Sequence, residues 1–128
     1  IKSSYSFFYP VDTFDILNDY NDNIDNKNPG LDFKVPTGTP VKPTAPGLVI
    51  FSGQKPALGN SIFIFHNDGF ISIYYNLKKL NVNKGDLIKT NDTNLAFADD
   101  SFHYELRKQT KDGIVTLNPK NFLKKRRK

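Results

Sequence analysis

The sequence contains no cysteine, methionine or tryptophan, and it has no long apolar run. The absence of cysteine excludes disulfide bonds and thiolate ligands for zinc, but it does not settle the cellular compartment. No apolar segment approaches the roughly 20 residues that a membrane-spanning helix needs. The aromatic residues that are present, 11 Phe and 6 Tyr, predict a core of aromatic and β-branched side chains, which favours sheet over helix.

The length and the charge of the chain predict one small domain with a basic end. A chain of 128 residues that is 38% hydrophobic can bury one core but not two. The formal net charge is +5, and residues 124–128 supply all of it, so the domain at 1–123 is close to neutral. The basic run is either a solvated terminus or a site for an anionic surface such as lipid headgroups or an envelope polymer. Nucleic acid is not expected, because no aromatic residues interleave with the run. It consists of Lys124, Lys125, Arg126, Arg127 and Lys128.

Strong turn signals divide the chain into predicted strands. Two apolar segments, 61–66 and 70–75, flank Asn67-Asp68-Gly69, and the Asp-Gly pair supplies the positive φ of a tight β-hairpin. Both segments carry apolar residues on both faces, which is typical of central strands that are covered on each side. The polar segment 18–28 is predicted to be a surface loop. Further strands are predicted at 47–53, 87–89, 95–98, 103–108 and 114–117.

Ten short motifs follow one another along the chain. They are Tyr9-Pro10-Val11, Asn28-Pro29-Gly30-Leu31-Asp32, Gly38-Thr39-Pro40-Val41, Gly47-Leu48-Val49, Gly59-Asn60, His66-Asn67-Asp68-Gly69, Tyr74-Tyr75-Asn76-Leu77, Val82-Asn83-Lys84-Gly85-Asp86, Ser101-Phe102-His103-Tyr104-Glu105 and Asn118-Pro119-Lys120-Asn121-Phe122-Leu123. In this order they resemble the lysostaphin/LytM-type zinc endopeptidases, which cut peptidoglycan cross-bridges. The resemblance covers Phe8 to Leu123. It implies an all-β domain, an antiparallel β-sandwich or flattened barrel of the LytM-like (duplicated hybrid motif) type.

The resemblance also assigns the positions of a zinc site. In the resembled enzymes the zinc is held by the first His of His-x-x-x-Asp, by its Asp, and by the second His of a His-x-His motif, and a water takes the open position. The matching residues here are Asn28, Asp32 and His103. Asparagine offers only a neutral carbonyl oxygen, which is a poor substitute for imidazole toward zinc. We therefore interpret these three residues as vestigial ligand positions and expect zinc to be absent.

The positions that match the catalytic histidines of the family are also substituted. Ser101 stands at the first His of His-x-His, and Asn76 stands at the His of Tyr-x-His-Leu. Neither side chain titrates near pH 7, so neither can act as a general acid or base. We expect no catalytic residue. The resemblance implies a degenerate groove lined by Asn28, Asp32, Tyr75, Asn76, Ser101 and His103.

Several of these residues also have simpler structural interpretations. Asp32 can accept hydrogen bonds from backbone N–H groups, and His103 can be a satisfied core or groove residue. Glu105 lies two residues after His103 and therefore on the same face of a strand, where it either orients His103 or carries a charge at the sheet edge. His66 matches a family histidine outside the metal site, so we expect it to be structural.

The resemblance implies a non-catalytic LytM-like domain that works by binding. It would hold peptidoglycan or a partner protein, for example a cell-wall hydrolase that it regulates or a component of cell division. The alternative is a zinc metallopeptidase that acts on peptidoglycan through a rebuilt metal site, and a structural or sugar-binding module on the same fold stays open. Since the chain begins at Ile1, we expect a longer exported precursor and a location in the periplasm or cell envelope.

Overall fold

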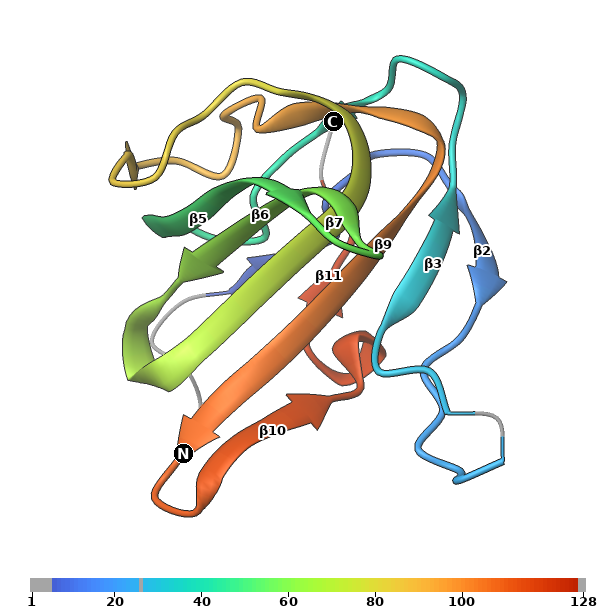
Figure 1. Cartoon of the computed structure of the whole chain (residues 1–128), viewed down its shortest axis with the longest axis vertical. Coiled ribbons are helices and arrows are strands. Elements are labelled where there is room, and N and C mark those ends of the chain that lie inside the picture. Colours follow the sequence, from blue (N-terminus) through green and yellow to red (C-terminus); the bar gives the residue numbers. More distant parts are fainter. Residues whose placement is uncertain (1–5, 26, 127–128) are drawn as a thin grey trace.

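Strands and two short 3₁₀ turns form the regular structure of residues 6–25 and 27–126, the part of the chain that the computed structural model describes (Figure 1). No helix in this part is long and apolar enough to cross a bilayer. The predicted all-β fold is confirmed. The strands are β1 (Phe7–Phe8), β2 (Asp15–Asn18), β3 (Leu31–Lys34), β4 (Pro40–Val41), β5 (Gly47–Lys55), β6 (Gly59–Phe65), β7 (Phe70–Leu80), β8 (Leu87–Ile88), β9 (Ala96–Thr110), β10 (Gly113–Leu117) and β11 (Leu123–Lys124), and the 3₁₀ turns are η1 (Asn67–Gly69) and η2 (Pro119–Asn121).

The main sheet has nine strands and is organised around β9. Its order is β2-β3-β9-β7-β6-β5-β8, with β10 and β4 also paired to β9, and every pair in it is antiparallel. Figure 1 shows β9 running diagonally through the molecule, with β7 on one side and β3 on the other. The predicted antiparallel architecture is confirmed, with one exception, since β1 and β11 form a separate parallel pair.

The predicted hairpin is formed by β6 and β7. The chain reverses through η1, where Asp68 has φ 63° and Gly69 has φ 78°. The N–H of His66 closes the turn by donating to the carbonyl oxygen of Phe70 at 2.8 Å. The Asp-Gly signal therefore located the turn correctly, because these residues tolerate the left-handed backbone that a tight reversal requires.

Side chains alternate along β9 between two faces of the sheet. Phe102 and Tyr104 lie in the core, where the ring of Phe102 stacks on Phe33 with 5.1 Å between centroids. His103 and Glu105 lie on the opposite face, which we call the outer face. The expectation that both faces of the hairpin strands are covered holds for most of β7, which is buried from residue 70 to 74. It is wrong for the end of β6, because Phe65 on the outer face is 39% exposed.

The basic C-terminal run is partly built into the domain. The division predicted at residue 123 cuts through β11, because Leu123 and Lys124 both pair with β1. The guanidinium of Arg126 is almost fully buried, with 7% of the side chain exposed, which is incompatible with a solvated tail at this position. Arg127 and Lys128 lie outside the described residues. The guanidinium of Arg126 donates to the carbonyl oxygens of Tyr9, Pro43 and Asn91 at 2.6–2.7 Å.

Candidate functional site

The predicted groove residues gather around His103 on the outer face. The antiparallel registers place Asp32 of β3 opposite His103 on one side and Tyr75 of β7 opposite it on the other. These residues line a hollow of about 410 Å³ together with Asn76 and Ser101. The end of β2 contributes Leu17 and Asn18, the tip of the β5–β6 hairpin contributes Ala57, Leu58 and Gly59, and β9 also contributes Phe102.

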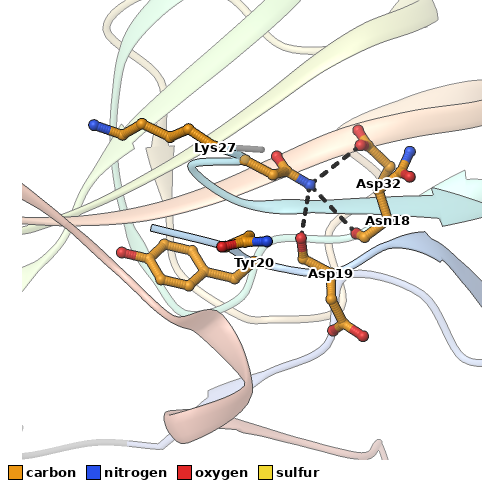
Figure 2. Close-up of a pocket in the computed structure, with 7 residues that line it drawn as sticks. Asn18, Asp19, Tyr20, Lys27 and Asp32 are labelled. Atoms are coloured by element: carbon orange, nitrogen blue, oxygen red, sulfur yellow. Dashed lines mark hydrogen bonds between the residues drawn. The ribbon is translucent and has the colours of Figure 1, made fainter. Parts of the chain in front are cut away.

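Asn28, the sixth predicted groove residue, lies in an adjoining hollow. This second hollow has a volume of about 570 Å³ and shares Asn18 and Asp32 with the first (Figure 2). Tyr20 and Lys27 from the predicted loop also line it. The structure therefore brings all six predicted residues to one region, with Asp32 at the junction of the two hollows. Their use as a binding groove stays a prediction.

Both ring nitrogens of His103 are engaged by carboxylates. Nδ1–H donates to Oδ1 of Asp32 at 2.6 Å, and Nε2–H donates to Oε2 of Glu105 at 3.0 Å. Burial alone would lower the pKa of His103, but the hydrogen bonds and negative charges of Glu105 and Asp32 outweigh it and raise the pKa. An imidazole can donate from both nitrogens only as the imidazolium. The raised pKa of His103 favours this imidazolium form, in which a cation lies between two carboxylates.

Glu105 connects this cation to Arg107. The carboxylate of Glu105 is 4% exposed and accepts from Nε and Nη2 of Arg107 at 2.9 and 2.5 Å. Burial would raise the pKa of Glu105, but the hydrogen bonds from His103 and Arg107 lower it. Four charges of alternating sign thus run from Asp32 to Arg107. Of the two interpretations of Glu105, the structure supports the one in which it orients His103.

Tyr75 covers the imidazolium on the groove side. Its ring stacks on His103 with 4.3 Å between centroids and 18° between planes, which is a cation–π geometry. Burial, with the negative charges of Glu105 and Asp32, raises the pKa of Tyr75 to about 12. The phenol therefore stays protonated at neutral pH and does not serve as a base.

The side-chain amide of Asn28 is oriented by the backbone around it. Nδ2 donates to the carbonyl oxygens of Asn18 and Asp19 at 3.4 and 3.0 Å, and to Oδ2 of Asp32 at 3.4 Å (dashed lines in Figure 2). Oδ1 accepts from the N–H of Gly30 at 3.3 Å. The amide consequently turns its NH₂ group, and not its carbonyl oxygen, toward Asp32.

Comparison with known families agrees with the fold and with the order of the motifs. The model of peptidase family M23 matches residues 26–114, which is more than half of the chain. The chain belongs to peptidase family M23.

Relatives in this family carry names of two kinds. The DD-carboxypeptidase/endopeptidase Mpg of Neisseria meningitidis is 32% identical over 61% of this chain and 19% of its own length. The cell division protein DipM of Caulobacter vibrioides is 36% identical over 49% of this chain and 10% of its own. The stage II sporulation protein Q of Bacillus subtilis is 34% identical over 62% of this chain and 29% of its own. The chain thus spans less than a third of the length of each of these relatives.

Solved M23 structures share the fold over almost the whole chain. The catalytic domain of the prophage-encoded M23 protein EnpA from Enterococcus faecalis superimposes with a TM-score of 0.72 at 26% identity, covering 88% of this chain and 95% of that one. A chain of the SpoIIQ–SpoIIIAH pore-forming complex has a TM-score of 0.80 at 22% identity, covering 96% of this chain and 94% of that one. Because the identity in this second comparison is only 22%, it is evidence for the fold alone.

The residues at the M23 metal position do not fit a zinc ion. A catalytic zinc needs three protein ligands with lone pairs directed at it. Here both nitrogens of His103 donate to carboxylates, and Asn28 presents an NH₂ group, which has no lone pair to give. Across residues 6–25 and 27–126, no group of three or more His, Cys, Asp or Glu side chains is placed to hold a metal ion.

The two substituted catalytic positions face each other at the hollow. Nδ2 of Asn76 donates to the carbonyl oxygen of Ser101 at 3.5 Å. Asn76 has φ 64° and lies where the register of β7 and β9 shifts, so a residue tolerant of the left-handed region occupies this bulge. Neither an asparagine amide nor a serine hydroxyl takes up a proton near neutral pH. No general base is therefore available from these two positions.

Gly30 is the residue whose importance sequence reasoning missed. A Cβ at this position would lie 2.0 Å from the carbonyl oxygen of Tyr104, 2.8 Å from Cγ of Glu105 and 2.9 Å from Nε2 of His103. Only glycine lets β3 approach β9 closely enough for Asp32 to reach His103. The Gly-x-Asp spacing of the motif carried this signal, because a glycine beside a polar strand residue marks a close backbone approach.

Proposed function

We propose that this M23 domain is non-catalytic and works by binding peptidoglycan or a partner protein in the groove around His103, in the periplasm or cell envelope. The observation that carries the proposal is the engagement of His103 by Asp32 and Glu105. A histidine that donates from both nitrogens is neither a metal ligand nor a base. The domain holds no zinc in this proposal, and it has no catalytic residue.

The names of two relatives support a role other than peptide hydrolysis, whereas Mpg is named as a peptidase. Two of the three relatives described above are named for cell division and for sporulation, not for a peptidase activity. A partner protein in the envelope, such as a cell-wall hydrolase or a division component, is therefore as suitable an occupant of the groove as peptidoglycan itself. Lys124 and Lys125 are exposed and remain available to an anionic surface, whereas Arg126 is not.

The groove offers the chemistry that such ligands need. Tyr75 presents an aromatic face that is held in place by its stack on His103. Asn76 is exposed and supplies an amide. Among the described residues, Oδ2 of Asp32 has one hydrogen bond, the long one from Asn28, so it can accept another. Aromatic faces with convergent polar groups are typical of sites that bind peptides and sugars.

Peptidoglycan sacculi, incubated with the domain and zinc chloride, test the proposal. We expect the domain to sediment with the sacculi, to release no soluble fragments, and to lose binding in Tyr75→Ala but not in Ile24→Ala, which changes a fully exposed side chain outside the groove. If the domain does not sediment with the sacculi, peptidoglycan is excluded as the ligand and a partner protein becomes the proposed occupant of the groove. Release of fragments that stops in Asp32→Ala would instead establish the alternative, a peptidase with a rebuilt metal site.

A further inference from the structure

A row of apolar side chains crosses the outer face of the main sheet beside the groove. The strand registers place Leu87 of β8 opposite Leu48 of β5, and Leu48 opposite Phe65 of β6. Phe65 lies opposite Ile71 of β7, which in turn lies opposite Arg107 of β9. Residues directly opposite each other in a sheet point to the same face. The row therefore lies on the face that also carries His103.

A second row lies next to the first. Phe51 is opposite Phe63, with 5.5 Å between ring centroids, and Phe63 is opposite Ile73, whose partner on β9 is Glu105. Ile50 sits in the register shift between Val49 and Phe51 and is 36% exposed. We call the six side chains of β5, β6 and β8 the apolar band: Leu48, Ile50, Phe51, Phe63, Phe65 and Leu87.

The apolar band is open to solvent and hollowed. Leu48 is 41% exposed, Phe65 39% and Leu87 64%. These three side chains, with Gly47 and Lys89, line a hollow of about 460 Å³. Scattered single apolar residues are normal on a surface, but a contiguous group marks an interaction site.

Two lysines lie at the apolar band. Nζ of Lys55 lies 4.5 Å from the ring centroid of Phe51 and 5.5 Å from that of Phe63, and Lys89 lines the hollow. Within the described residues, neither lysine has a carboxylate within ion-pair distance, and the hollow has no acidic lining residue. A second copy of the chain would bring lysine against lysine, which is unfavourable.

We propose that the apolar band docks a segment of a partner protein that presents apolar side chains next to carboxylates. The apolar side chains would fill the hollow, and the carboxylates would pair with Lys55 and Lys89. The hollow favours a protruding side chain over a flat lipid surface. This inference goes beyond the proposed function, because the surface is separate from the groove hollow and shares none of its lining residues.

A displayed library of random peptides, selected on the purified domain, tests the proposal. We expect the enriched peptides to combine Leu, Ile or Phe with Asp or Glu. Leu87→Glu should weaken their binding by at least about tenfold, since it places a repelling charge in the hollow. The matched control is Val115→Glu, which changes a side chain of similar chemistry that is 44% exposed on β10, away from the hollow. Circular dichroism on both variants establishes that they are folded, and Lys89→Glu repeats the test if Leu87→Glu is not.

Other outcomes would overturn the proposal. Enriched peptides without acidic residues, or peptides that bind Leu87→Glu and Val115→Glu equally, contradict it. Sedimentation with phosphatidylglycerol vesicles that is lost in Leu87→Glu would make the band a lipid-binding surface, and a concentration-dependent dimer lost in the same variant would make it a contact between copies. Tyr75→Ala keeps peptide binding at the band unchanged, so failure here is distinguishable from failure of the groove.

Discussion

The two histidines of the chain sit in opposite electrostatic environments, although both are buried and both use both ring nitrogens. His66 lies on the core side, where Nδ1–H donates to the carbonyl oxygen of Pro46 at 2.7 Å and Nε2 accepts from the hydroxyl of Ser72 at 2.7 Å. Burial lowers the pKa of His66 to about 4. The neutral imidazole suits these two contacts, in which one ring nitrogen donates and the other accepts.

His103 shows what the same side chain becomes between carboxylates. Asp32 and Glu105 reverse the effect of burial and hold a proton on each nitrogen. The comparison teaches that burial alone does not define the role of a histidine, because its hydrogen-bond partners decide its charge. The resemblance implies a zinc-ligand position at His103, and in our proposal the carboxylates of Asp32 and Glu105 engage its ring nitrogens instead.

Removal of Glu105 is expected to have the largest effect on this comparison. Glu105→Ala leaves His103 without one acceptor and Arg107 without its partner, and breaking a buried ion pair in this way costs about 3–5 kcal/mol in the free energy of unfolding. Urea unfolding monitored by circular dichroism measures the loss. Glu105→Gln keeps the volume and an acceptor for Arg107, and we expect about 1–2 kcal/mol. An exposed ion pair contributes about 1 kcal/mol or less. A loss for Glu105→Ala that is no larger than this would contradict the charge network.

Acid should destabilise the protein through His66. Its pKa is about 4 in the folded state and near 6.5 when unfolded, so the unfolded chain binds the proton first as the pH falls. The contribution to the free energy of unfolding is present above pH 6.5 and is lost toward pH 4, by about 3 kcal/mol. Unfolding curves across this range measure it. His66→Asn keeps a donor for Pro46 but does not titrate, and an unchanged slope in this variant would contradict the assignment.

Alkaline pH should act through His103 with the opposite sign. Its pKa is raised in the folded state, so its contribution is fully present below pH 6.5 and is lost as the pH rises through the folded value. We expect a decline in the free energy of unfolding that His103→Gln abolishes. The imidazole resonances, followed by nuclear magnetic resonance, give an independent test. If His103 titrates below His66, the comparison fails.

The stack of Tyr75 on the imidazolium should give the smallest effect. Tyr75→Ala removes the cation–π contact and the cover over His103, which costs about 1–2 kcal/mol in the free energy of unfolding. Tyr75→Phe keeps the ring and should change the value by less than about 0.5 kcal/mol. Equal losses in the two variants would show that the hydroxyl, and not the stack, stabilises this part of the groove.

The sequence predicted those parts of the fold that local chemistry specifies. Asp68-Gly69 gave the hairpin because a positive φ is needed there. The family resemblance assigned Asp32 and His103 to one groove, and the structure places them opposite each other on the paired strands β3 and β9. Strands β1 and β11 were not predicted, because two residues each are too few for any periodicity and their pairing joins the two ends of the chain.

Other features depend on contacts that no spacing reveals. In the sequence, Arg126 is one cation of a basic run, and nothing there indicates that it is buried. Its burial depends on the fold, which brings the carbonyl oxygens of Pro43 and Asn91 around its guanidinium. The amide of Asn28 is oriented by backbone groups of the 18–28 loop, which the sequence leaves without a predicted conformation. Phe65 was expected to be covered because apolar residues on both faces indicate a buried strand, yet one face is open.

Zinc titration by calorimetry tests the central claim most directly. The purified domain and the double variant Asp32→Ala, His103→Ala are titrated with zinc chloride at neutral pH, with Asn28→His as the variant that returns the missing ligand type. The account predicts no heat for the native chain beyond that of the double variant, and a gain in affinity for Asn28→His. Tight one-to-one binding by the native chain that the double variant loses would contradict the account and restore the peptidase hypothesis.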